Sequence, residues 1–317
     1  MRLTPALARC TSRYRLRCLL AVAVGMLLTS CFTGVEGTRR VVMSKNDVAA
    51  TRPGAEEQLV AGLTGTPLAQ WQPGREFIVL DDRAALMFDP HTLPADPLSL
   101  HLSGDTLRYQ GNDRRVTPGL DTLTVLRFAD SVRTYSLPLR QSRITSMEMP
   151  MMADAAIVHR LDTMLRGRTL WVRNPMWHTA DSLTVQGLKY SPVRVEKVLP
   201  GVNVYPVRIC FRTDSLSGWL PVALPGAGPA SRSFAQQFSL TDPRSNYPAI
   251  TDETWRLIQQ QRVAEGMTKD EARLSLGAPK DVSQGHNSAL LYELWQYPDG
   301  SYLMFCDGLL QRFKLAR

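Results

Sequence analysis

A degenerate internal repeat constrains the fold of this chain more than any other feature of its sequence. Residues 74–79, Gly-Arg-Glu-Phe-Ile-Val, match residues 167–172, Gly-Arg-Thr-Leu-Trp-Val. Downstream, the run from Tyr109 to Phe128 parallels the run from Tyr190 to Phe211, and each contains a Pro-Gly pair. The Gly-Arg pairs lie 93 residues apart and the Pro-Gly pairs 82. The difference indicates an extra loop in the first copy, around residues 89–97.

The repeat reads as short strands joined by turns. In the second copy Val207, Ile209 and Phe211 alternate with polar residues, which is the pattern of a half-buried strand. Pro-Gly pairs favour turns because proline fixes φ and glycine accepts a positive φ. A short helix with one apolar face precedes each copy, the first beginning near Ala55 and the second capped by Asp154. We therefore expect two small antiparallel barrels or half-barrels, over residues 56–141 and 142–224.

The last 67 residues predict a separate α-α-β-β-β module at 251–317, after a linker at 225–250. Thr251 begins a first helix, and Thr268 with Glu271 forms a capping box at the start of a second. Three apolar runs follow, at residues 290–297, 301–306 and 309–315, with an Asp-Gly pair at each junction. Asp-Gly is a strong hairpin signal. The whole chain therefore belongs to the α+β class.

This last module resembles the SmpA/OmlA (BamE-like) lipoprotein family. The resemblance is carried by Gly266-Met-Thr-Lys-Asp-Glu, Leu276-Gly-Ala-Pro, Tyr292-Glu-Leu-Trp-Gln-Tyr and Phe305-Cys-Asp-Gly, in that order and spacing. It covers about the last 60 residues. It implies a small module of the outer-membrane β-barrel assembly machinery. The usual member is little more than this module, whereas here a long β-rich repeat precedes it, so the role in barrel assembly does not follow from the resemblance alone.

The first 30 residues have the order of a secretory signal peptide. Five arginines and no acidic residue precede an apolar run from Cys18 to Leu28, which is about half of the ~20 residues that a spanning helix needs. Leu28-Thr-Ser-Cys31 resembles the bacterial lipobox, which implies that Cys31 is acylated and becomes the new N-terminus. The alternatives are an ordinary cleaved signal and an uncleaved membrane anchor. Residues 31–55 then form a flexible tether.

The lipobox reading fixes the expected location. Several acyl chains on Cys31 would hold the protein on a membrane, because each buried CH₂ contributes about 0.8 kcal/mol and one chain anchors weakly. Phe32 follows the cysteine in place of the Asp that retains many lipoproteins in the inner membrane. We therefore expect an outer-membrane lipoprotein that faces the periplasm.

Charge and cysteine content exclude two classes of protein. The formal charge is +8, but five of the 37 basic residues lie in the signal peptide, which leaves 32 against 29 acidic residues. A net charge of about +3 gives no basic footprint for nucleic acid. Beyond the predicted signal and anchor only Cys210 and Cys306 remain, too few for a disulfide scaffold. We expect two reduced thiols, with a bridge as the alternative.

No catalytic motif, cofactor-binding motif or metal-ligand spacing is found in the sequence. The five histidines are scattered, and the methionines of residues 147–152 are more typical of core filling than of a metal site. We therefore expect no enzymatic activity, cofactor or metal. The aromatic residues Trp171, Trp177 and Tyr190 are the candidate binding residues, as the lining of a groove for an extended peptide. The alternative places Trp171 and Tyr190 in the core and Trp177 against a loop.

Two hypotheses of function follow. The first is a membrane-tethered interaction or scaffold protein of the bacterial envelope, with a protein partner in outer-membrane assembly or envelope integrity. The alternative is a peptidoglycan-binding lipoprotein that uses the tandem β-rich repeats.

Overall fold

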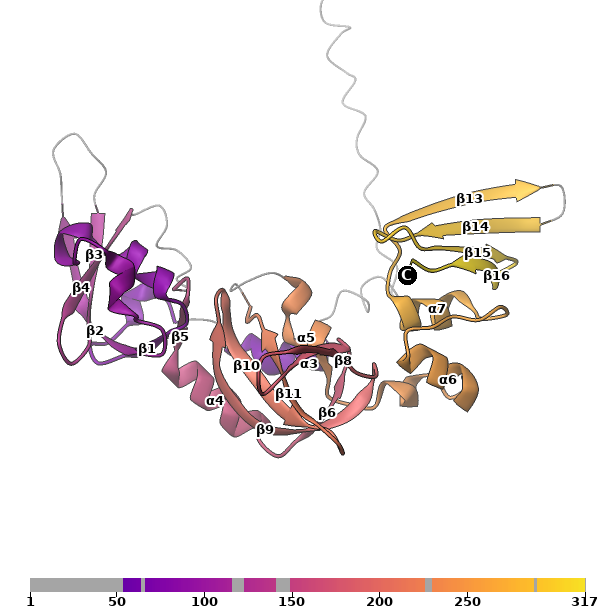
Figure 1. Ribbon diagram of the computed structural model, residues 1–317, viewed down its shortest axis with the longest axis horizontal. Helices are drawn as coiled ribbons and strands as arrows, with labels where there is room; N and C mark the ends of the chain where they lie inside the picture. The colour runs from indigo at the N-terminus through magenta and orange to yellow at the C-terminus, as the bar shows by residue number, and fades with distance from the viewer. Residues whose placement is uncertain are drawn as a thin grey trace, which may run out of the picture. The chain divides into compact units, whose positions relative to one another are not determined.

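The computed structural model describes residues 54–63, 66–115, 123–140, 149–225, 230–287 and 290–316 (Figure 1). Strands of these residues form three antiparallel sheets, and none of the sheets closes on itself. The mixed helix-and-sheet class is therefore confirmed. The closed-barrel alternative is wrong, because the two outermost strands of each sheet do not pair with each other. The half-barrel alternative stays a prediction. The predicted signal peptide and Cys31 lie outside the described residues.

The first sheet has the strand order β4-β3-β2-β1-β5. Its aromatic core holds Trp71, Phe77, Tyr109, Phe128 and Tyr135, each at most 6% exposed. Three short 3₁₀ helices between β1 and β2 occupy the place of the predicted extra loop; they are η2 (Asp82–Met87), η3 (Pro90–Thr92) and η4 (Pro97–Leu100). The strands are β1 (Glu76–Val79), β2 (Thr106–Arg115), β3 (Leu123–Ala129), β4 (Thr134–Arg140) and β5 (Met152–Asp154).

The second sheet has the order β12-β6-β9-β10-β11-β7-β8. Between its first two core strands the chain inserts the β7–β8 hairpin in place of 3₁₀ helices. The strands are β6 (Thr169–Val172), β7 (Met176–Thr179), β8 (Thr184–Gln186), β9 (Ser191–Val202), β10 (Tyr205–Arg212), β11 (Ser217–Val222) and β12 (Phe238–Ser239).

The internal repeat is present in both sheets. The order β5-β1-β2-β3-β4 of the first corresponds to β12-β6-β9-β10-β11 of the second. At the start of each copy a glycine with positive φ, Gly74 (94°) or Gly167 (76°), donates its N–H to the second strand. The acceptors are the carbonyls of Tyr109 (2.7 Å) and Val195 (2.9 Å).

The strand register corrects part of the sequence alignment. Tyr109 lies opposite Phe128, and Val195 lies opposite Phe211. Phe128 and Phe211 are therefore equivalent, as the sequence indicates. The equivalent of Tyr109, however, is Val195 and not Tyr190. The two copies insert different lengths of chain between their first two strands, which shifts the alignment there.

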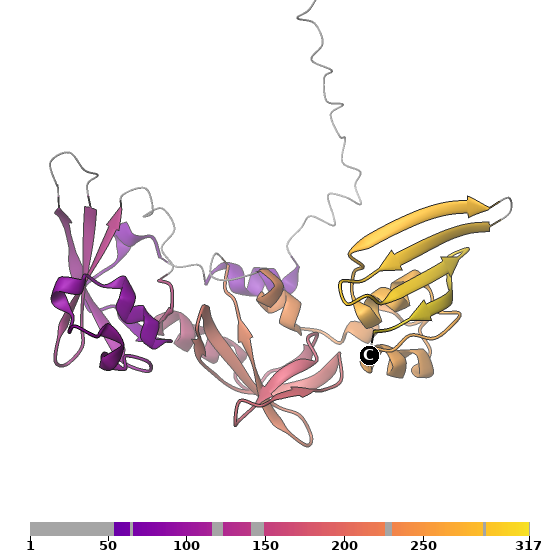
Figure 2. The same cartoon turned by 45° about the horizontal axis from the view of Figure 1, so that its top comes forward.

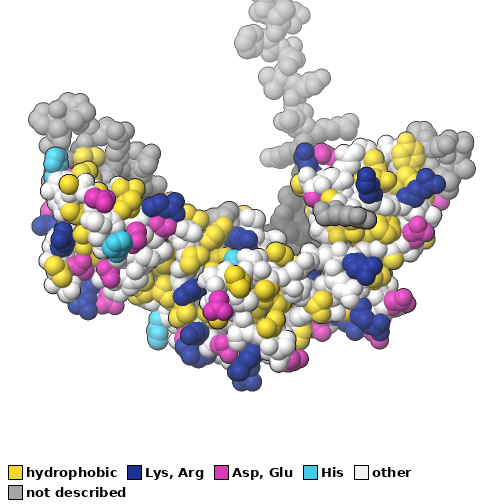
Figure 3. Space-filling model, viewed as in Figure 1, with side chains coloured by type: hydrophobic (Ala, Val, Ile, Leu, Met, Phe, Trp, Pro, Cys, Tyr) yellow, Lys and Arg dark blue, Asp and Glu magenta, His cyan; other side chains and the backbone are white. Residues whose placement is uncertain are grey.

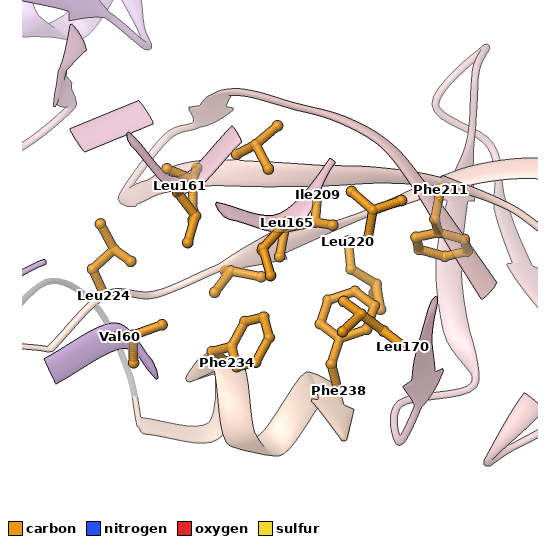
Figure 4. Close-up of a cluster of buried hydrophobic side chains, with 14 of the residues drawn as sticks. Val60, Leu161, Leu165, Leu170, Ile209, Phe211, Leu220, Leu224, Phe234 and Phe238 are labelled. Carbon is orange, nitrogen blue, oxygen red and sulfur yellow. The ribbon is translucent and has the colours of Figure 1, made fainter. Parts of the chain in front are cut away.

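Three helices belong to the core of the second sheet, and Figure 4 shows side chains from them meeting those of the sheet. They are α3 (Ala55–Ala61), α4 (Ala155–Leu165) and α5 (Phe234–Gln237). Leu161 and Leu165 of α4 are fully buried, and Asp154 caps this helix as predicted. Val60 of α3 packs in the same cluster, although the sequence places α3 with the first copy. Glu56 fixes α3 by accepting hydrogen bonds from Ser239 Oγ (3.0 Å) and the Leu240 N–H (3.1 Å).

Part of the predicted linker at 225–250 is an element of the second sheet. Phe234 and Phe238 are fully buried, and β12 pairs with β6. The stretch therefore does more than connect two modules: it supplies the edge strand that β5 supplies in the first sheet.

The C-terminal residues form two helices and the C-terminal sheet, β13-β14-β15-β16 (Figure 2). The predicted caps at Thr251 and Thr268 and the capping box with Glu271 are confirmed. Residues 281–287, for which the sequence analysis predicts no strand, form an additional strand. The elements are α6 (Asp252–Gln259), α7 (Lys269–Leu276), β13 (Asp281–Asn287), β14 (Leu290–Gln296), β15 (Tyr302–Cys306) and β16 (Leu309–Lys314). Cys210 and Cys306 are free thiols, as expected.

Candidate protein-interaction surface

The three aromatic residues singled out in the sequence do not share one groove. Trp177 is 4% exposed and packs edge-on against Phe211, with ring centroids 5.6 Å apart, so its ring belongs to the core of the second sheet. Trp171 is half-buried on β6, where it lies opposite Pro192 and Ser239. Tyr190 is half-buried and stacks on Trp255 of α6 at 5.7 Å. A role for these residues in partner binding stays a prediction.

Tyr190 and its neighbour Lys189 join the second sheet to α6 and α7. The Lys189 backbone N–H donates to the Gln259 carbonyl at the end of α6 (2.9 Å). Its ammonium donates to the carbonyls of Leu274 (2.6 Å) and Ser275 (3.1 Å) in the last turn of α7. A cation at this position satisfies carbonyls that have no partner within the helix and complements the helix dipole. Burial lowers the pKa of Lys189 to about 8.

The C-terminal sheet has one face covered by helices and one that no helix of the described residues covers. Trp295, Leu303, Phe305 and Leu310 are buried together with Ala272 of α7. Figures 1 and 2 show α6 and α7 on one side of this sheet. Because side chains alternate between the faces of a strand, the intervening residues lie on the opposite side. This outer face carries Tyr292, Leu294, Tyr302, Met304, Cys306 and Leu309.

The strand register places the outer-face residues in rows across the sheet. One row runs Gly285–Tyr292–Cys306–Leu309 and the next Ser283–Leu294–Met304–Arg312. The Tyr292 ring covers Gly285, where a Cβ would lie 2.2 Å from the ring carbon Cζ. Tyr292, Tyr302 and Leu309 are 41%, 39% and 44% exposed. Adjacent rows of exposed apolar side chains are typical of interaction surfaces. On the helix-covered side, Val282, Leu291 and Phe313 at the border of the sheet are also exposed, at 48%, 58% and 38%.

One edge of the outer face is basic. Arg312 and Lys314 of β16 continue the apolar rows and are exposed. Neither residue makes an ion pair with any residue that the structure describes. Figure 3 shows hydrophobic and basic side chains together at the surface of the C-terminal region. The face thus presents an apolar centre with unpaired positive charge at one side.

The inner face holds a polar cluster that stabilises the module. Glu293 is 8% exposed and accepts from the Lys269 ammonium (2.6 Å), from Gln284 Nε2 (3.2 Å) and from the Trp295 indole. The hydrogen bond from Lys269 lowers the pKa of this carboxyl, against the effect of burial. The cluster ties α7 to β13 and β14. It is enclosed between elements of the module, so we assign it to folding and not to recognition.

Within the described ranges no group of three or more His, Cys, Asp or Glu side chains is arranged to hold a metal ion. Met149 and Met152 are buried in the core of the first sheet. None of the helices in this part of the chain is both long and apolar enough to cross a membrane.

Sequence reasoning missed the outer face, although β14 carried a signal for it. The run Leu-Leu-Tyr-Glu-Leu-Trp-Gln-Tyr at 290–297 is apolar at both odd and even positions. A half-buried antiparallel strand alternates apolar with polar residues, so apolar residues on both faces indicate that both faces are covered. No family model, curated protein or solved structure matches this chain.

Proposed function

We propose that this chain is a lipid-anchored, non-enzymatic interaction protein of the bacterial envelope, whose C-terminal sheet docks a partner protein on its outer face. Acylation of Cys31 would tether it to the periplasmic side of the outer membrane, and the SmpA/OmlA resemblance points to the β-barrel assembly machinery as the source of the partner. The outer face of the C-terminal sheet is the observation that carries the proposal.

The chemistry of this face specifies the partner. Tyr292, Tyr302 and Leu309 are each about 40% exposed on this face. A partner that covers them removes apolar area from water, which contributes roughly 25 cal/mol of binding free energy per Å². Arg312 and Lys314 then favour a partner that places carboxylates beside its apolar contact, because complementary charge speeds association and sets orientation. The partner is therefore a protein with an apolar patch bordered by acidic residues.

Site-specific photo-crosslinking in intact envelopes tests this proposal. A photoreactive phenylalanine at Tyr302 is expected to crosslink a barrel-assembly subunit, whereas the same group at Val132, which is 82% exposed in the first repeat, is not. Arg312→Glu is expected to reduce the Tyr302 crosslink at least tenfold without changing the melting temperature. Equal crosslinking from both positions would contradict the proposal.

Two further measurements separate the alternatives. Cys31→Ser is expected to release the protein from the membrane fraction, and unchanged fractionation would indicate an uncleaved signal anchor. Pelleting of the detergent-solubilised chain with purified peptidoglycan, undiminished by Arg312→Glu, would favour the cell-wall alternative.

A further inference from the structure

The second sheet carries a polar cluster on the face that α3, α4 and α5 leave uncovered. Ile209, Phe211 and Leu220 point into the helix-covered core (Figure 4). The residues between them therefore lie on the other side. A row of directly opposed residues crosses five strands of this side, from β9 through β10, β11 and β7 to β8; it runs Lys197–Cys210–Trp219–His178–Thr184.

A stacked pair of rings forms the centre of this row. His178 lies on Trp219 with ring centroids 4.4 Å apart and an interplanar angle of 29°. Trp219 is 8% exposed, and its indole N–H donates to the Thr179 carbonyl at 3.0 Å. His178 Nδ1 lies 3.3 Å from Thr184 Oγ1. These contacts fix the positions of both rings, and the surrounding side chains pack against them.

Two arginines flank β11 beside these rings. On β10, Arg208 lies opposite Pro221, with its guanidinium carbon 5.5 Å from the Trp219 ring centroid. On the other side of β11, the Arg232 carbonyl accepts from the Ala223 N–H (2.8 Å). Pro221 and Ala223 are two residues apart and so lie on one face of the strand. The backbones of the two arginines therefore flank the same end of β11.

The positive charge of Arg232 acts on the His178 ring. Burial lowers the pKa of His178, and the positive charge of Arg232 lowers it further. No carboxylate of the described residues forms an ion pair with Arg208 or Arg232. Glu196, on the neighbouring strand β9, is paired with Arg212 at 3.2 Å. The cluster therefore holds positive charge that none of the residues in the described segments neutralises.

Both guanidinium groups also have a buried donor without a partner. Arg208 Nε and Arg232 Nη1 are shielded from solvent and make no hydrogen bond with the residues described. A buried donor left without a hydrogen bond destabilises the folded protein, and more so when the group is charged. Guanidinium groups are suited to oxyanions, which accept two parallel N–H bonds in one plane. A bound oxyanion would satisfy both donors and neutralise the local charge.

We propose that Arg208 and Arg232, beside the Trp219–His178 stack, form a binding site for an oxyanion, the carboxylate or phosphate group of a ligand. The site lies on the second sheet and involves no residue of the outer face of the C-terminal sheet. It is thus independent of the function proposed above, and either assignment can fail without the other.

NMR of arginine side-chain Nε–Hε groups in the full chain, solubilised in a maltoside detergent, tests the site directly. The probes are sodium phosphate and sodium acetate, titrated at constant ionic strength with chloride as the balancing anion. The Nε resonances of Arg208 and Arg232 are expected to shift together and to saturate with one dissociation constant. Saturation by phosphate alone would identify a phosphate-bearing ligand, and saturation by acetate would identify a carboxylate.

Substitutions then assign the binding to these residues. Arg208→Gln is expected to weaken the affinity for the anion at least tenfold, as monitored by the Arg232 resonance, and Arg232→Gln should do the same for Arg208. Arg212→Gln, an exposed position on the same strand, is the matched control and should leave the affinity unchanged. Because the titration of the unaltered protein needs no variant, it decides the matter even if a variant fails to fold. Shifts that stay linear in both anions, or equal losses in all three variants, would overturn the proposal.

Discussion

The first and second sheets share a five-strand frame but differ in what the chain adds to it. In each sheet the frame begins after a Gly-Arg pair and its five strands have the same order, and the second sheet adds β7 and β8 beyond β11. The first inserts 3₁₀ helices after its opening strand and fills its core with aromatic rings. The second inserts the β7–β8 hairpin and collects all three helices α3, α4 and α5. The repeat thus determines the five equivalent strands. The segment inserted after the first strand and the helices that pack on the sheet determine which surfaces each sheet offers for contact.

The largest expected effect tests whether the two sheets are separate cores. Phe128→Ala and Phe211→Ala each remove an equivalent, fully buried ring and should each cost about 3–5 kcal/mol. Hydrogen exchange followed by mass spectrometry should show faster exchange in β1–β5 for the first variant and in β6–β12 for the second. Equal acceleration in both sheets by both variants would mean that they unfold as one cooperative unit.

A second prediction tests the division of the N-terminal segment between the sheets. Leu63 is 2% exposed in the core of the second sheet, and Leu68, five residues later, is 6% exposed in the core of the first. Leu63→Ala should destabilise the second sheet by about 2–5 kcal/mol and leave the first protected, with Leu68→Ala as the matched opposite. The same exchange measurement reports both. Protection lost in the first sheet alone for Leu63→Ala would refute the assignment of α3.

The smallest expected effect concerns Lys189, which connects the second sheet to α6 and α7. The pKa of Lys189 falls from 10.5 to about 8 on burial, so between these values the unfolded chain binds more protons than the folded one. Stability should therefore rise with pH in this window, by about 2 kcal/mol between pH 7.5 and 9.5. Calorimetric melting at several pH values measures it.

Lys189→Met is the control for this pH dependence. Methionine retains much of the aliphatic stem but does not titrate, so the variant should lose the rise in stability over the same range. A rise that persists in Lys189→Met would assign it to other groups.

Sequence patterns predicted helix ends and turns correctly where these depend on contacts between residues close together in the chain. The cap at Asp154, the capping box of Thr268 with Glu271 and the Asp307-Gly308 turn depend on contacts within a few residues, and each is present. Residues 281–287 were missed as a strand because Gly285 and the polar residues around it carry no strand pattern, and pairing with β14 supplies the missing preference.

The candidate surfaces were harder to foresee. Trp177 and Tyr190 are large aromatic residues of the kind that bind partners. In the structure, however, Trp177 fills a core and Tyr190 stacks on Trp255. The Arg208–Arg232 cluster joins residues from β10 and from the predicted linker. Their positions across β11 follow from strand pairing, which a single sequence does not specify.

By itself the sequence determined that two copies of a short-strand unit precede a small helix-and-sheet module, and where most of the C-terminal helices and strands begin and end. Repetition, turn residues and helix caps suffice for that, because they act over a few residues. Only the tertiary structure decided that the sheets stay open, that α3 packs with the second copy, and which face of the C-terminal sheet the described helices cover. Those outcomes depend on which apolar surfaces, far apart along the chain, bury one another.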